Sequence, residues 1–251
     1  MLFLRSLIFN IVGYSTLGVG CIVNSIIGVF SPKLTVKIWC HVFLPFLLLA
    51  LKYLAGLSIE VRGKQYIQNI PALYASKHES ALETYSLPTI VKYAAFVLKK
   101  ELTYIPIFGW AQAFYGMIAV NRSGGGAAMK GMLKDAQKRI NEGRSVAIFP
   151  EGTRIKPGLK GEYKSGLLFL AQNLKVPVVP VALNTGMFWR KNSFLRYPGK
   201  VIIEFLEPMP DNLDKKEFMS LLEERIESKC REINEETVKN YPWSKVNLFE
   251  E

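Results

Sequence analysis

A histidine and a carboxylate five positions apart, His78 and Glu83, are the residues in this 251-residue sequence whose types suit proton-transfer chemistry. A neutral imidazole accepts a proton near pH 7, and a carboxylate bonded to its second ring nitrogen fixes the tautomer and stabilises the imidazolium. On an ideal helix five residues turn through about 500°, which leaves the two side chains roughly 140° apart. The pair can therefore meet only if His78 lies just before a helix and Glu83 lies in its first turns. The same spacing also fits a structural histidine bonded to a main-chain carbonyl beside a glutamate that begins a helix.

A second polar group follows an apolar run, where Val146 to Phe149 leads into Pro150-Glu151-Gly152-Thr153-Arg154. Proteins of the α/β class bind ligands at the carboxyl ends of their strands. Arg154 can bind a phosphate through two parallel hydrogen bonds, while Glu151 can accept hydrogen bonds from a substrate hydroxyl or fix the loop. An internal ion pair between Glu151 and Arg154 is the alternative. The sequence therefore predicts either an anion-binding loop around Gly152 and Thr153 or a turn closed on itself.

Two further groups of basic residues could contact an anion. Lys99 and Lys100 follow a predicted strand, and Arg122 precedes the glycine-rich segment Gly124 to Gly126. Adjacent lysines hold a phosphate as point charges, and the N–H groups at a helix N-terminus also favour anions. Solvated lysines and a ligand-free glycine-rich turn are the alternatives here. The sequence holds no GxxxxGK[ST] pattern, which argues against a nucleoside triphosphate site.

Residues 1–57 hold two apolar runs, Leu7 to Phe30 and Ile38 to Leu51. The first run carries no charge over 24 positions, which is long enough to cross a bilayer as a helix. Nothing after Phe30 resembles the cleavage site of a signal peptide, so we interpret residues 1–57 as a retained membrane-anchoring helical pair. Basic residues lie on both sides of the runs, at Arg5, Lys33, Lys37 and Lys52. This distribution fits a pair lying in one leaflet as well as a hairpin across the bilayer, and two buried core helices are the third alternative.

From Ile59 onward, short β-rich runs alternate with helical patterns. Seven strands are predicted at Ile59–Arg62, Leu73–Ser76, Ala94–Leu98, Met117–Val120, Val146–Phe149, Val178–Leu183 and Val201–Phe205. Helices are predicted at Gly126–Asn141, Lys164–Asn173 and Lys215–Tyr241. This alternation is typical of an α/β fold with a mixed sheet flanked by helices, which we assign to residues 58–251.

Charge and cysteine content limit the partners. The formal net charge of +11 suits an anionic partner, either nucleic acid, an anionic membrane surface or a phosphorylated substrate. No nucleic-acid-binding motif accompanies this charge, so we expect no nucleic-acid partner. The three cysteines lack any paired or CxxC spacing, which argues against a disulfide framework and a zinc site and favours a reducing, cytoplasmic compartment.

Four motifs in this order carry a family resemblance. They are His78-x4-Glu83, Lys99-Lys100-Glu101-Leu102 continuing to Asn121-Arg122, Phe149-Pro150-Glu151-Gly152-Thr153-Arg154, and Val176-Pro177 continuing to Pro180. Over about residues 70 to 185 the sequence resembles the glycerophospholipid acyltransferases, and among them the bacterial 1-acyl-sn-glycerol-3-phosphate acyltransferases. The third motif is highly specific, whereas the fourth is weak alone. One residue departs from the family pattern, because Glu83 stands where the family has aspartate.

The resemblance implies a reaction and a role for each motif. His78 would act as general base on the free sn-2 hydroxyl of lysophosphatidic acid, and Glu83 would orient it. The hydroxyl would attack the thioester of acyl-CoA or acyl-ACP (acyl carrier protein), with no covalent enzyme intermediate, no cofactor and no metal. Arg154, Lys99 or Lys100, and less directly Arg122 would hold the glycerol phosphate. Main-chain N–H groups of the Pro150–Gly152 turn or of the His78 helix start are the alternatives for stabilising the oxyanion.

The same resemblance implies a membrane enzyme of phospholipid biosynthesis, in the cell inner membrane with its catalytic domain on the cytoplasmic face. Three alternatives stay open. The acceptor could be glycerol 3-phosphate, another lysophospholipid or a lyso-ornithine lipid, the protein could be a thioesterase, or it could bind membranes without catalysis. Neither the acyl donor nor the oligomeric state follows from the sequence.

Overall fold

A seven-stranded mixed sheet forms the centre of the molecule, with strand order β1-β7-β6-β2-β5-β3-β4. The structure is a computed structural model and describes residues 1–91, 93–121 and 123–249. The strands are β1 Leu57–Arg62, β2 Leu73–Ser76, β3 Ala95–Lys99, β4 Ile118–Val120, β5 Val146–Ile148, β6 Val178–Leu183 and β7 Gly199–Phe205. All neighbouring pairs are parallel except β6 with β7, which is antiparallel. The predicted mixed α/β sheet is therefore confirmed, and each predicted strand agrees within two residues.

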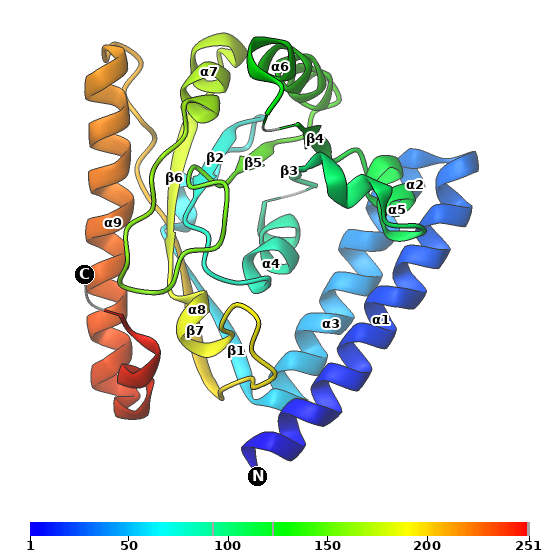
Figure 1. The fold of residues 1–251 in the computed structure, drawn as a ribbon, viewed down its shortest axis with the longest axis vertical. Helices are drawn as coiled ribbons and strands as arrows, with labels where there is room; N and C mark the ends of the chain where they lie inside the picture. The colour runs from blue at the N-terminus through cyan, green and yellow to red at the C-terminus, as the bar shows by residue number, and fades with distance from the viewer. Residues whose placement is uncertain (92, 122, 250–251) are drawn as a thin grey trace.

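Helices cover both faces of the sheet (Figure 1). The helices of the α/β part are α4 Leu82–Ile90, α5 Phe108–Tyr115, α6 Gly125–Asn141, α7 Ser165–Leu174, α8 Thr185–Phe188 and α9 Lys215–Asn240. On one face α6, α7 and α9 pack against one set of strand side chains, and on the other α4 and α8 pack against the alternate set, as the two-residue period of a strand requires. The helix α9 buries the predicted stripe of Phe218, Leu222, Ile226, Cys230 and Ile233. Asp214 and Glu217 form a capping box that begins α9.

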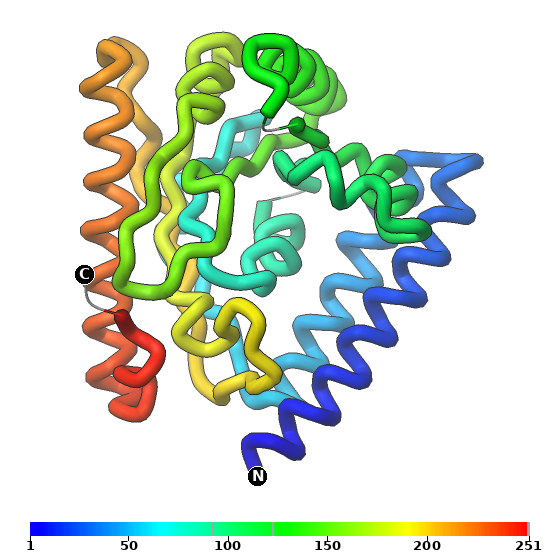
Figure 2. Tube along the Cα trace, viewed as in Figure 1, coloured from blue at the N-terminus to red at the C-terminus, as the bar shows by residue number. Residues whose placement is uncertain are grey.

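The N-terminal residues form two antiparallel helices beside the α4 face of the sheet. The first is α1 Leu2–Phe30, and the second runs without a break through α2 Pro32–Ile38, η1 Trp39–Phe43, α3 Leu44–Ala50 and η2 Leu51–Ala55. Both are long and apolar enough to cross a membrane, with mean hydropathies of 1.7 and 2.0. The short 3-10 segments η3 Lys64–Tyr66, η4 Lys100–Tyr104 and η5 Pro242–Asn247 complete the structure. Figure 2 traces the chain from this helical pair on one side of the molecule to α9 on the other.

The second N-terminal helix is longer than its apolar run predicts. Lys33 and Lys37 were expected in the link between two helices, but both lie within α2. Ser31 accepts a hydrogen bond from the Leu34 N–H, and Pro32 occupies the first helical position, where its missing N–H costs nothing. The link is thus reduced to Ser31, and the two helices pack closely along their length. Gly56, with φ +73°, ends the second helix in the left-handed conformation that leads into β1.

Candidate active site

His78 and Glu83 lie just beyond the carboxyl end of β2. His78 follows this strand by two residues, and α4 begins at Leu82, so that Glu83 lies in its first turn. The His78 Nδ1 and the Glu83 Oε1 are 2.8 Å apart. Because an ionised carboxylate only accepts, the ring carries its proton on Nδ1 and keeps Nε2 for a partner elsewhere. The expected geometry, a histidine just before a helix and a glutamate that reaches back, is confirmed.

Four hydrogen bonds fix the Glu83 carboxylate, which has no exposed surface. Its Oε1 accepts from His78 and from the main-chain N–H groups of Glu79 and Ser80 at 2.8 and 2.7 Å. Its Oε2 accepts from the Thr185 hydroxyl at 2.8 Å. Hydrogen bonds to an ionised acceptor are stronger than those between neutral groups, so these donors hold the carboxylate in a single position. The glutamate therefore makes the histidine contact in spite of its extra methylene.

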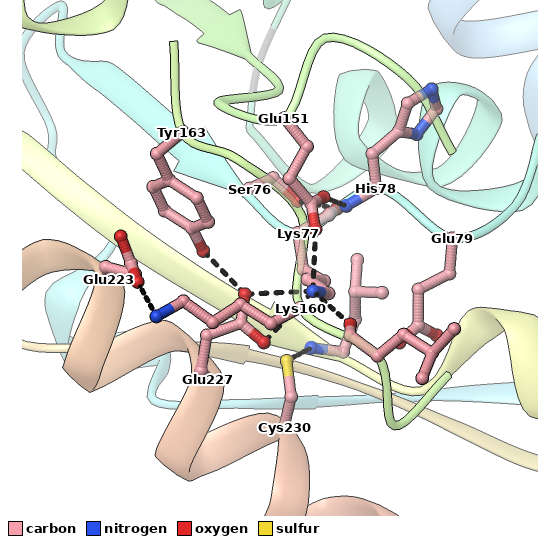
Figure 3. A network of polar contacts seen from close by, with 12 residues as sticks. Ser76, Lys77, His78, Glu79, Glu151, Lys160, Tyr163, Glu223, Glu227 and Cys230 are labelled. Carbon is pink, nitrogen blue, oxygen red and sulfur yellow. Dashed lines mark hydrogen bonds and ion pairs between the residues drawn. The ribbon is translucent and has the colours of Figure 1, made fainter. Parts of the chain in front are cut away.

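The imidazole of His78 packs against the residue that follows β5. Its ring stacks on Phe149 at a centroid distance of 3.8 Å and an interplanar angle of 12°, and Phe96 stacks behind Phe149 at 5.5 Å. The side chain of His78 keeps 13% of its surface exposed, on the side of the cleft described below. Figure 3 shows the ring directed away from the buried charges beneath the loop. Because Nδ1 contacts Glu83 and one ring face stacks on Phe149, Nε2 is the ring nitrogen left to contact a ligand.

The turn after β5 is tied to the His78 loop rather than to itself. Glu151 is 3% exposed, and its Oε2 accepts the main-chain N–H of His78 at 3.0 Å. Its Oε1 is 2.6 Å from the Lys77 Nζ, so the predicted alternative of a Glu151–Arg154 ion pair is wrong. Gly152 has φ +67°, a conformation that favours glycine, and its N–H donates to the Phe149 carbonyl. Of the two roles considered for Glu151, the structure supports fixing the loop.

A cleft of about 1260 Å³ opens in front of His78. One part of its wall comes from the apolar face of α1, and another comes from α6 and α7. The polar residues that line the cleft include Lys99, Asn121, Glu151, Thr153, Arg154, Lys164 and Ser165. A large, mostly apolar cleft with a few convergent polar groups is the usual form of a site for an amphipathic ligand.

Only some of the predicted anion-binding residues that the structure describes line the cleft. Arg154 lines the cleft, and its guanidinium makes no hydrogen bond or ion pair with the described part of the chain. Lys99 also lines the cleft and is 3.5 Å from the Glu101 carboxylate, whereas Lys100 is exposed outside the cleft lining. The prediction for Arg122 lies outside the described residues. Arg154 and Lys99 are therefore the basic side chains of the prediction that the structure brings to the cleft.

Most N–H groups considered for the oxyanion are used within the protein. At the helix start, the N–H groups of Glu79 and Ser80 donate to Glu83, and that of His78 donates to Glu151. At the turn, the Gly152 N–H donates to the Phe149 carbonyl. The N–H groups at the helix start therefore already donate to the Glu83 and Glu151 carboxylates.

Sequence reasoning missed three contacts of this site. Thr185, which bonds Glu83, lies 102 positions further along the chain and has no local signal. Lys77 is buried beneath the loop, and a lysine directly after a buried strand could have drawn attention to it. Phe149 was recognised as part of a motif, but its stacking on the histidine was not foreseen.

Comparisons with known proteins agree with this geometry. The model of the Acyltransferase family matches residues 58–184, about half of the chain. The 1-acyl-sn-glycerol-3-phosphate acyltransferase of Pseudomonas aeruginosa is 38% identical over 169 residues, which cover 67% of this chain and 64% of that protein. The protein of the same name from Cocos nucifera is 29% identical and matches 63% of this chain and 52% of its own length. The chain therefore matches less than two thirds of the length of either relative.

One solved structure has the same fold over nearly the whole chain. The crystal structure of the 1-acyl-sn-glycerophosphate (LPA) acyltransferase PlsC from Thermotoga maritima superposes with a TM-score of 0.75 at 22% identity, covering 93% of this chain and 98% of that one. At this identity the likeness establishes the fold. The family match includes the His78 loop, Glu83 and the turn from Phe149 to Arg154. The chain belongs to the acyltransferase family.

Proposed function

We propose that this protein transfers an acyl chain from a thioester donor to the sn-2 hydroxyl of 1-acyl-glycerol 3-phosphate and so forms phosphatidic acid. The observation that carries the proposal is the His78–Glu83 pair in the wall of a largely apolar cleft that also holds Arg154. A base, an anion-binding side chain and an apolar volume are what a lysolipid with a reactive hydroxyl requires. The names of the Pseudomonas and Cocos relatives, both 1-acyl-sn-glycerol-3-phosphate acyltransferases, support the same acceptor.

In this mechanism His78 Nε2 takes the proton of the hydroxyl as its oxygen attacks the thioester carbonyl. Glu83 holds Nδ1–H and stabilises the imidazolium that forms. The tetrahedral intermediate then collapses, the carbon–sulfur bond breaks, and the thiolate takes the proton from His78. The acyl chain is transferred directly to the acceptor oxygen, and His78 returns to its neutral state.

Arg154 and Lys99 would hold the phosphate of the acceptor within the cleft. The planar guanidinium of Arg154 suits a bidentate phosphate contact, and Lys99 adds a point charge. Lys100 and Arg122 stay in the proposal as further positive charges for the phosphate. Gly152 and Thr153 complete the turn from which Arg154 extends.

Residues 1–57 would anchor the enzyme to the membrane, and residues 58–251 would form its catalytic part. The helix α1 carries exposed apolar side chains such as Ile11, Ile26 and Val29, while other residues of the same helix line the cleft. An anchor that is also a wall of the site would give a lipid acceptor a short path from the bilayer to His78. We propose the cell inner membrane as the location, with the site on the cytoplasmic face, where acyl-CoA and acyl-ACP are available.

The test of the proposal is thiol release from palmitoyl- or oleoyl-CoA by the detergent-solubilised full chain, with and without 1-acyl-glycerol 3-phosphate. We expect release that requires the acceptor and yields an equal amount of phosphatidic acid. Release that ignores the acceptor would identify a thioesterase. Transfer only to glycerol 3-phosphate or another lysolipid would refute the proposed acceptor, and the same assay with acyl-ACP identifies the donor.

Replacing Arg154 with alanine is expected to raise the KM for the lysolipid about 10- to 100-fold, since hydrogen bonds between charged groups contribute about 1.5–3 kcal/mol. The KM for the acyl donor should change little. Arg154→Lys should recover part of the loss, because it restores the charge without the bidentate geometry. Steady-state kinetics with each substrate varied in turn measures both constants. An unchanged lysolipid KM in Arg154→Ala would remove Arg154 from the phosphate site.

A single acidic residue on the exposed face of α1 should weaken membrane binding. Ile26 is 59% exposed, and burying an isoleucine side chain in an apolar medium contributes about 1.5–3 kcal/mol. We expect Ile26→Glu to lower partition onto anionic vesicles about 10- to 100-fold, as measured by sedimentation. The matched control is Val246→Glu, because Val246 is 68% exposed and lies in η5, on the side of the molecule away from α1 (Figure 1). Equal effects of the two substitutions would contradict the anchor assignment.

A further inference from the structure

A buried lysine beneath the catalytic loop joins three separate segments of the chain (Figure 3). Lys77 is 1% exposed, and its Nζ lies 2.6 Å from the Glu151 carboxylate and 2.8 Å from that of Glu227. It also donates to the Leu159 carbonyl at 3.1 Å. Glu227 lies on α9 and accepts in addition from the Tyr163 hydroxyl at 3.0 Å. The ammonium group thus connects the end of β2, the turn after β5 and the C-terminal helix.

These contacts lead directly to the His78 main chain. Glu151 uses Oε1 for Lys77 and Oε2 for the His78 N–H, at 2.6 and 3.0 Å. The His78 carbonyl accepts the Ile155 N–H at 2.8 Å, so the loop and the turn are tied at both main-chain groups of the histidine. Without its cation, Glu151 would be a buried carboxylate facing another carboxylate. Such a group moves or takes a proton, because burying an unpaired charge is strongly unfavourable.

The buried Lys77 side chain does not line the cleft in the described part of the chain. It is absent from the described lining of the cleft, whereas His78 and Glu151 belong to that lining. Its ammonium group is held by ion pairs with Glu151 and Glu227 and by a hydrogen bond to the Leu159 carbonyl. Any influence on the reaction must therefore pass through Glu151 and the main chain of the loop.

We propose that Lys77 is a positioning residue of the acyl-transfer site, whose ion pairs with Glu151 and Glu227 hold the His78 loop against the 149–154 turn. The inference rests on the proposed function, because acyl transfer is one of its readouts. A shift of the loop would displace the base from the attacking hydroxyl while leaving the walls that bind the two substrates in place.

The charges around Glu151 give the proposal a pH signature. Burial raises the pKa of Glu151 to about 7, and the positive charge of Lys77 opposes this rise. Burial alone would lower the pKa of Lys77, but the charges of Glu151 and Glu227 raise it. Among the described residues, the other titratable groups beside these charges are Glu79, Tyr163 and Cys230. Removing the lysine charge should therefore move the low-pH limb of kcat to higher pH.

The first variants are Lys77→Met and Lys77→Arg. We expect Lys77→Met to lower kcat about 100-fold, the size of effect that a misplaced reacting group produces, with the KM of each substrate within about twofold of wild type. Lys77→Arg should recover part of this loss and keep the wild-type pH profile, because it restores the buried positive charge. Glu227→Gln should lower kcat by a smaller factor, since the side chain of Glu227 is 17% exposed and Glu151 still holds the lysine.

Two controls separate positioning from unfolding. Glu223→Gln lies one turn earlier on α9, where Glu223 pairs with the half-exposed Lys160, and it should leave kcat unchanged. The double variant Lys77→Met/Glu151→Gln removes both buried charges and so avoids an unpaired carboxylate. If Lys77 acts through Glu151, the double variant should lose no more activity than Glu151→Gln alone, while additive losses would overturn the inference. Thermal unfolding of each variant shows whether it is folded at the assay temperature.

A chemical readout tests the loop without any turnover. The chain has two histidines, so the rate at which diethyl pyrocarbonate modifies His78, followed by mass spectrometry, can be compared with the rate at His41 in each protein. We expect faster modification of His78 alone in folded Lys77→Met. Unchanged modification together with wild-type kcat would overturn the inference. A wild-type protein inactive with every donor and acceptor would refute the proposed function, and the modification rates would still decide the role of Lys77.

Discussion

Replacing His78 with alanine is expected to lower kcat for acyl transfer about 10²- to 10⁴-fold, the usual contribution of a positioned general base. The structure holds this imidazole in one orientation, with Nδ1 bonded to Glu83 at 2.8 Å and the ring stacked on Phe149 at 3.8 Å. Its Nε2 is then the group that can take the proton of the acceptor hydroxyl. Thiol release and phosphatidic acid formation should fall together, while the KM of the lysolipid should stay near its wild-type value. Both are measured at saturating donor.

The matched control is His41→Ala. His41 lies in η1 of the second N-terminal helix, where its Nε2 and the Tyr93 hydroxyl are 2.9 Å apart, and it is not among the described residues that line the cleft. Its removal should leave kcat within about twofold of wild type, since it has no contact with the reacting groups. Retention of more than about a tenth of the wild-type kcat in His78→Ala would refute the general-base role. Equal losses in both variants would show that the assay reports folding or membrane binding instead.

The local part of the site could be predicted because it depends on short-range geometry. Helix periodicity excludes a shared face for residues five apart, so a contact between His78 and Glu83 requires the histidine to precede the helix. The structure has this arrangement, with α4 beginning at Leu82. The strands could be predicted for a similar reason, because each is a short apolar run between turn-forming residues.

The long-range part could not be predicted from one sequence. Thr185 meets Glu83 because β6 lies beside β2 in the sheet, a neighbour relation set by topology. Glu227 reaches Lys77 because α9 packs on the face below the catalytic loop, 150 residues further along the chain. Neither partner has a neighbouring sequence that distinguishes it from the other threonines and glutamates of the chain. The length of the second N-terminal helix was missed for a local reason, since the apolar run begins only at Ile38, whereas Ser31 and Pro32 together begin the helix.

The carboxylates around His78 are not equivalent. Burial raises the pKa of Glu79 well above its ordinary value, and its carboxyl group accepts a hydrogen bond from the Gly186 N–H at 2.9 Å. Glu83 instead accepts four hydrogen bonds, one of them from His78. The two side chains therefore contact different groups: Glu79 accepts the Gly186 N–H, and Glu83 bonds the His78 Nδ1. The two residues therefore form a matched pair for mutagenesis within one loop.

Replacing Glu83 with glutamine is expected to lower kcat about 10²- to 10⁴-fold, because the amide keeps the shape of the side chain but removes the charge that stabilises the imidazolium. Its oxygen can still accept the N–H groups of Glu79 and Ser80, so the loop should stay folded. Thermal unfolding checks this, and kcat is measured from thiol release at saturating substrates. Glu79→Gln is the control, and it should stay near wild type because the Glu79 side chain contacts the Gly186 N–H and not the His78 ring, and a glutamine oxygen can still accept that hydrogen bond.

Glu83→Asp tests the departure from the family pattern. The present main chain places a glutamate carboxylate 2.8 Å from His78 Nδ1, so an aspartate on the same main chain would lie one methylene short. We expect this variant to lose about tenfold in kcat, since the charge is kept but the contact is lengthened. The order of activity should therefore be wild type, then Glu83→Asp, then Glu83→Gln. A kcat of Glu83→Asp equal to that of wild type would show that the loop moves to restore the contact with His78. A loss of kcat in Glu83→Gln no larger than that in Glu79→Gln would show that the charge of Glu83 has no part in the reaction.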